Sequence, residues 1–128
     1  GNEEQFKELQ RHEFSHSYVN YLSKIHLSKL MEYEEMITPL KSSMESMAYG
    51  SWEICVNEHI IRAVTTRMAF FDCVAEGEEA LLYEKGRDFI YIEKLVDKLE
   101  EYENKRDEYR TFEEFYPQLI MVFEEYMS

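Results

Sequence analysis

Two histidines and a glutamate near the start of the chain have the spacing of a zinc site. His12, Glu13 and His16 form the pattern H-E-x-x-H. No Pro or Gly occurs between Asn2 and Thr38, and apolar residues recur there at helical spacing, which predicts a helix. On a helix, His12 and His16 lie one turn apart on one face and can take two corners of a tetrahedral zinc site. Glu13 would then be the general base for the attacking water, although the same pattern also occurs by chance on polar helix faces without a metal.

A catalytic zinc usually has three protein ligands, so His12 and His16 need a partner from elsewhere. We expect Glu58 in this role, since it shares a largely apolar helix with Arg62, where a carboxylate–arginine pair is costly to bury without a function. Arg62 would orient Glu58 or contact an anionic group of the substrate or the oxyanion. Two alternatives stay open: an ordinary Glu58–Arg62 pair on a solvated strip, and His59 as the ligand.

The other candidate groups are weaker. Tyr83 and Tyr91 are further possible oxyanion donors, and we expect His26 to be solvated in a charged stretch. Cys55 and Cys73 are expected to be small core residues and not a disulfide or a metal pair. A di-metal bundle is not supported, because E-x-x-H occurs only once in the chain.

Length and charge restrict the class of protein. The chain has 128 residues, of which 45% are hydrophobic, so it is long enough for one domain with one core. A net charge of -13 argues against nucleic acid or an anionic membrane surface as the partner and favours cations. No apolar run is long enough to span a bilayer.

The periodicity predicts an all-α fold, a single domain over residues 1–128 with about five to seven helices. The expected helices cover about 3–26 with the metal motif, 27–37, 39–49, the central helix 51–72, 77–86, 89–109 and 112–127. In the first, Tyr18, Tyr21, Leu22 and Ile25 should form the apolar face. In the helix over 89–109, Glu103 belongs to the polar face.

Particular residues mark the expected helix ends. The residue before Pro39 should leave the helical region, so that Pro39 begins a new helix and Gly50 ends it. The stretch from Thr111 to Glu114 is typical of a capping box, and Pro117 should occupy the first turn of the last helix.

These motifs resemble a known family. The stretch His12 to Asn20, with Asn57, Glu58 and Arg62, resembles the gluzincin branch of the zincin-like metallopeptidases. It is most similar to an uncharacterised bacterial domain-of-unknown-function family with the motif H-E-F, a small residue, H-S, an aromatic residue, V-N. The resemblance extends to two stretches in the tail, 102–106 and 115–117, and so covers nearly the whole chain.

The resemblance implies a zinc-dependent peptidase acting on a peptide or protein substrate. It implies Zn²⁺ as cofactor, His12, His16 and Glu58 as metal ligands, Glu13 as general base, and an exported protein. Zincins carry a sheet before the H-E-x-x-H helix, and only 11 residues precede His12 here, so we expect the helical C-terminal part of a longer protein. The alternative is a non-catalytic helical interaction module with an empty or relic metal site.

Overall fold

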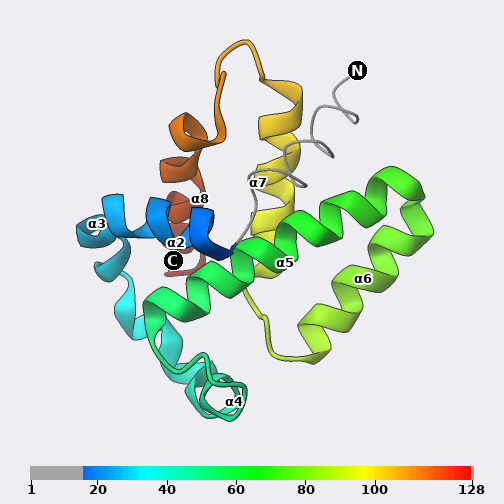
Figure 1. Cartoon of the computed structure of the whole chain (residues 1–128). Coiled ribbons are helices and arrows are strands. Elements are labelled where there is room, and N and C mark those ends of the chain that lie inside the picture. Colours follow the sequence, from blue (N-terminus) through cyan, green and yellow to red (C-terminus); the bar gives the residue numbers. More distant parts are fainter. Residues whose placement is uncertain (1–15, 128) are drawn as a thin grey trace.

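All regular structure in residues 16–127, the part of the chain that the computed structural model describes, is helical (Figure 1). The elements are α2 (His16–Ile25), α3 (Leu27–Met31), the 3-10 helix η1 (Glu34–Leu40), α4 (Lys41–Ser46), α5 (Trp52–Asp72), α6 (Val74–Gly86), α7 (Ile92–Asn104) and α8 (Phe112–Met127). This confirms the all-α prediction.

Helix α5 is the element on which the others pack. It begins where expected, because the Ser51 hydroxyl accepts a hydrogen bond from the Ile54 backbone N–H at 3.2 Å. Its buried residues cover most of its circumference, and α2, α6 and α7 each contact it, while Ile54 and Thr65 are exposed. A helix buried on most of its sides is the natural centre of a small bundle.

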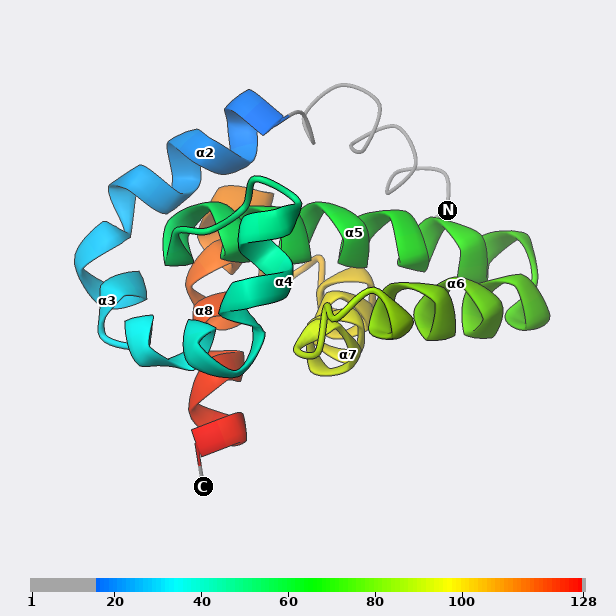
Figure 2. The same cartoon turned by 90° about the horizontal axis from the view of Figure 1, so that it is seen from below.

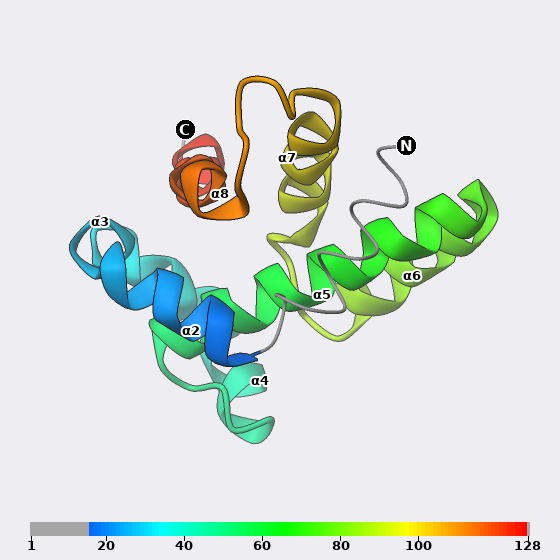
Figure 3. The ribbon, with the colours of Figure 1, turned by 45° about the horizontal axis from the view of Figure 1, so that its top comes forward.

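Helix α6 returns along α5 and lies unusually close to it. A Cβ atom at Gly77 would come within 2.2 Å of the Phe70 ring, so only glycine allows this approach. Figures 2 and 3 show the distal part of this helix pair extending away from α2, α3 and α8. The groove between α5 and α6 forms part of the candidate site described below.

The core on the other side of α5 is aromatic. Trp52 packs edge-on against Tyr91 and Phe123, with ring centroids 6.2 and 5.1 Å away. The Trp52 indole N–H donates to the Leu30 carbonyl at 2.9 Å, so this large buried side chain leaves no polar atom without a partner.

The prediction that Pro39 begins a new helix was wrong. Pro39 lies inside η1, and the next helix is the short α4. A proline has no N–H to give to the Met36 carbonyl three residues earlier. The Tyr91 hydroxyl donates to that carbonyl instead, at 2.7 Å, which explains how the 3-10 helix passes through the proline.

Other helix ends also differ from the prediction. Gly77 lies inside α6, which begins earlier because the Cys73 sulfur accepts the Glu76 N–H at 3.4 Å. Cys73 is therefore an exposed helix cap and not a core residue, whereas Cys55 is buried as expected. Pro117 is the sixth residue of α8 and not in its first turn, although Thr111 caps that helix as predicted, accepting from the Glu114 N–H at 3.2 Å.

The apolar face of α2 was also misplaced in part. Leu22 is buried, but Tyr21 and Ile25 are about half exposed. Val19 and Ser23 face the core with Leu22 instead. Similarly, α7 covers only Ile92–Asn104 of the expected 89–109.

Candidate metal centre

The packing of α2 on α5 brings together two predicted ligands that are 42 residues apart in the chain. The Nε2 atom of His16 lies 2.9 Å from the Oε2 atom of Glu58. Glu58 is only 5% exposed, whereas the His16 side chain projects into solvent from the first turn of α2. The buried Glu58 carboxylate therefore contacts an imidazole that is exposed to solvent.

The other two predicted site residues, His12 and Glu13, lie outside the described residues. Within 16–127, no group of three or more His, Cys, Asp or Glu side chains could hold a metal. A three-ligand set that includes the His16–Glu58 pair therefore needs a residue from outside this range, and the motif predicts His12.

The donor atoms of the pair fit a zinc ion. Imidazole nitrogen and carboxylate oxygen are common zinc ligands, and two such donors at tetrahedral corners lie about 3.4 Å apart. The observed 2.9 Å contact between His16 and Glu58 is within about half an ångström of that separation. Small side-chain rotations would be enough to open it for a metal.

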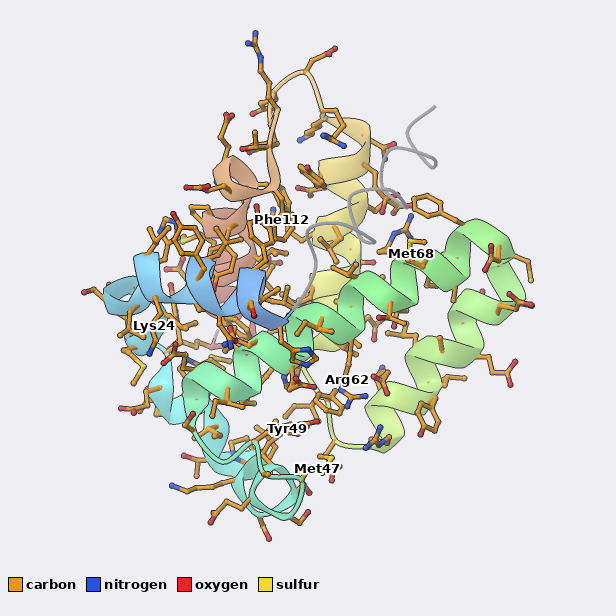
Figure 4. All side chains as sticks on the ribbon, viewed as in Figure 1. Lys24, Met47, Tyr49, Arg62, Met68 and Phe112 are labelled. Carbon is orange, nitrogen blue, oxygen red and sulfur yellow. The ribbon has the colours of Figure 1, made fainter. Side chains whose placement is uncertain are left out.

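Arg62 lies between Glu58 and a second carboxylate, Glu84. Its Nε is 3.5 Å from Glu58 Oε1, and its Nη1 donates to both Glu84 oxygens at 3.0 and 3.3 Å. Burial lowers the pKa of Arg62, but hydrogen bonds to Glu84 and Tyr49 outweigh it and raise that pKa, so the guanidinium is charged. Figure 4 shows Arg62 and Tyr49 pointing toward one another beside α5. The alternative of a pair on a solvated strip does not fit, because both carboxylates are buried.

A cavity of about 450 Å³ opens beside the pair. Its walls come from α2, the segment before α5, α5 and α6, and are His16, Tyr49, Glu58, Ile61, Arg62, Thr65, Thr66, Ala80, Tyr83 and Glu84. Tyr83 thus adjoins the site, whereas Tyr91 is buried with its hydroxyl committed to the Met36 carbonyl. A larger cavity, of about 560 Å³, lies between α3, η1 and the start of α5, but no histidine lines it.

His59 is not placed as a ligand. Its Nδ1–H donates to the Cys55 carbonyl at 2.9 Å, and its Nε2 accepts the Tyr91 backbone N–H at 3.4 Å. Complete burial lowers its pKa to about 4, so it is a neutral core side chain. His26, expected to be solvated, is instead half-buried and stacked on the Tyr116 ring with centroids 5.3 Å apart.

A buried polar network fixes α2 against α5, and the sequence did not reveal it. The Asn57 side-chain N–H donates to the Asn20 amide oxygen at 2.7 Å, and the Ser23 hydroxyl donates to the Asn57 amide oxygen. Ser23 also contacts the Tyr116 hydroxyl, at 2.5 Å. Because Ser23 gives its only hydroxyl hydrogen to Asn57, the Tyr116 hydroxyl is the donor in this contact. Burial raises the pKa of Tyr116 to about 12, so the phenol carries its proton.

The network explains two motif residues for which metal chemistry has no use. Asn20 follows His16 by one helical turn, and Asn57 immediately precedes Glu58. Their hydrogen bond therefore sets the register in which the two proposed ligands meet. The motif was visible in the sequence, but the partner of each asparagine was not.

Residues 16–127 thus define an all-α protein with a histidine–glutamate pair where two helices pack together. The chain belongs to the family described as domain of unknown function (DUF4932), whose model matches residues 1–122. This confirms the expected membership of an uncharacterised domain family, while the gluzincin relationship stays a prediction. No curated protein and no solved structure matches the chain. In the part of the chain that the structure describes, no helix is long and apolar enough to cross a membrane.

Proposed function

We propose that this chain is the helical part of a zinc-dependent peptidase in which His12, His16 and Glu58 hold the metal. The observation that carries the proposal is the 2.9 Å contact between His16 and Glu58. The sequence predicts the two residues on different grounds, His16 from the H-E-x-x-H pattern and Glu58 from its charge on a largely apolar helix. Two side chains chosen at random on different helices would rarely meet in this way.

The proposed chemistry is hydrolysis of a peptide bond. Zinc, when bound, lowers the pKa of a coordinated water toward about 7 and polarises the substrate carbonyl. Glu13 accepts the proton of the attacking water and delivers it to the leaving amine. The Arg62 charge is already shared between two carboxylates, Glu58 and Glu84, and is not free for an anionic substrate group. Tyr83, at the cavity, is the better placed of the two tyrosines to stabilise the oxyanion.

The substrate would lie along the cavity between α5 and α6. This cavity begins at His16 and Glu58, so a bound peptide would reach the metal there. The proposal also includes an exported setting, which follows from the family resemblance.

The test is metal content by mass spectrometry on the chain purified without chelator. We expect near-stoichiometric zinc in the unaltered chain and its loss in His12→Ala, His16→Ala and Glu58→Ala. His26→Ala and Glu79→Ala are the controls, a histidine outside the site and an exposed glutamate, and both should keep the metal. An unaltered chain that takes up no zinc even when zinc is supplied would contradict the proposal and favour the interaction module with a relic site.

A further inference from the structure

Glu84 is a buried carboxylate with no role in the mechanism proposed above. It lies on α6 with its side chain about one-tenth exposed, and both its oxygens accept from Arg62 Nη1. Burying a carboxylate is costly unless it is paired, and here the pairing is with a residue that also faces the candidate metal centre. Glu84 therefore acts on Glu58 indirectly, through Arg62, which contacts both carboxylates.

The guanidinium of Arg62 is shared unequally between its two carboxylates. Nη1 makes hydrogen bonds to Glu84 at 3.0 and 3.3 Å, whereas the buried Nε has no hydrogen-bond partner among the described residues and is 3.5 Å from Glu58. The Phe89 ring, 4.4 Å from the guanidinium carbon, and the Tyr49 hydroxyl hold the group in this orientation. Glu58 is left with one oxygen near Arg62 and the other facing His16.

This arrangement matters because arginine prefers to bind a carboxylate with two parallel hydrogen bonds. An Arg62 released from Glu84 would turn toward Glu58 and take both of its oxygens. Glu58 would then have no oxygen directed at His16. While Arg62 is bound to Glu84, one Glu58 oxygen therefore stays directed at His16.

We propose that Glu84 is a positioning residue that holds Arg62 back from Glu58 and so leaves a Glu58 oxygen free to bind the metal. The inference rests on the proposed function. It predicts that Glu84 controls zinc affinity although it touches neither His16 nor the metal.

The first measurement is zinc affinity of the full chain by competition with a chromophoric chelator. Glu84→Ala should weaken zinc binding by about 10- to 100-fold, the usual cost of losing a partner of a metal ligand. Glu84→Gln should lose less, since the Gln carbonyl still accepts from Arg62. The matched control Glu79→Ala removes an exposed carboxylate from the same helix and should change nothing.

A second substitution separates positioning from a merely structural role. In Glu84→Ala combined with Arg62→Met, the group that competes for Glu58 is gone, so zinc affinity should recover toward that of the unaltered chain. If the Glu84–Arg62 pair is only structural, the double variant should bind zinc no more tightly than Glu84→Ala alone. That result, or a Glu84→Ala variant with unchanged zinc affinity, would overturn the inference. Glu84→Gln with and without Arg62→Met gives the same comparison where Glu84→Ala does not fold.

A crystal structure of metal-free Glu84→Ala tests the inference without zinc. We expect Arg62 bound to both Glu58 oxygens, and His16 Nε2 well beyond its present 2.9 Å from Glu58 Oε2. An unchanged distance between these two atoms would show that Glu84 does not position Glu58. If the unaltered chain binds no zinc but His16 and Glu58 move apart in the variant, the proposed function fails while the positioning role stands.

Discussion

At the scale of single residues, the candidate site depends on which of its buried side chains are charged. Glu58 is buried between His16 and Arg62, with one of its oxygens facing each of these side chains. His59, its neighbour in the chain, is equally buried but neutral and bonded within the core. Helix α5 thus places Glu58 toward the candidate site and the neutral His59 toward the core.

The role of Glu13 is tested by Glu13→Gln. The substitution keeps the size of the side chain and removes its ability to accept a proton, so zinc binding should stay nearly unchanged and peptide hydrolysis should be abolished. The measurement is turnover of a peptide library by the full-length protein, with metal content determined on the same sample. Hydrolysis at the unaltered rate would show that Glu13 is not the base.

The buried His59 predicts a pH dependence of stability. Its pKa is lowered to about 4 in the folded chain, from an ordinary value near 6.5, so the unfolded chain binds the extra proton first. The stabilisation is fully present above pH 6.5 and is lost as the pH falls toward 4, by up to about 3 kcal/mol. Urea unfolding of the unaltered chain and of His59→Leu between these pH values should show a flatter curve for the variant. Parallel curves would contradict the assignment.

At the scale of elements, the site depends on how α2 is fixed on α5. The Asn20–Asn57 hydrogen bond and the Ser23 and Tyr116 hydroxyls form the polar part of this contact. Polar pairs of this kind have directional geometry, unlike apolar packing, and so they select one register.

We expect Asn57→Ala to lower the free energy of unfolding by about 2 kcal/mol, because it removes the amide oxygen to which the buried Ser23 hydroxyl donates. Asn20→Ala should cost less, since Asn20 is exposed. The double variant should cost less than the two single changes added together, as expected for side chains in contact. Denaturant unfolding of the four proteins measures this coupling, and strictly additive losses would show that the asparagines do not interact.

At the scale of the whole molecule, a buried ion pair joins α5 to α7. The Nε and Nη2 atoms of Arg67 donate to the two oxygens of Glu103, each at 2.8 Å. Burial raises the pKa of Glu103 and Arg67 opposes that effect. The pair lies far along α5 from the candidate metal centre and fixes α7 against the same central helix.

Removing one member of this pair should destabilise the fold strongly. Glu103→Leu leaves the Arg67 charge buried beside the more distant Glu100, 3.7 Å away, so we expect a loss of about 3 to 5 kcal/mol. The combined change Arg67→Met and Glu103→Leu should recover most of it, because no charge stays buried. Thermal and denaturant unfolding would check both, and a double variant as unstable as Glu103→Leu would contradict the explanation.

The sequence by itself determined the all-α class, the position of the central and last helices, and the candidate chemistry. Ser51 marked the start of α5, apolar residues around its whole circumference marked it as central, and Thr111 marked the start of α8. These signals are local, because caps and periodicity depend on residues within a few turns. The H-E-x-x-H pattern is local in the same sense, whereas Glu58 and Arg62 were inferred from a distant segment.

Only the tertiary structure decided which side chains meet. It paired Arg62 with Glu84, moved Glu103 from an expected polar face into a buried ion pair, and joined Asn20 to Asn57. Each of these contacts links residues 22 to 37 positions apart, on different helices. Their geometry follows from how helices pack on α5, which side-chain periodicity does not specify, since the same apolar stripe permits more than one register and crossing angle.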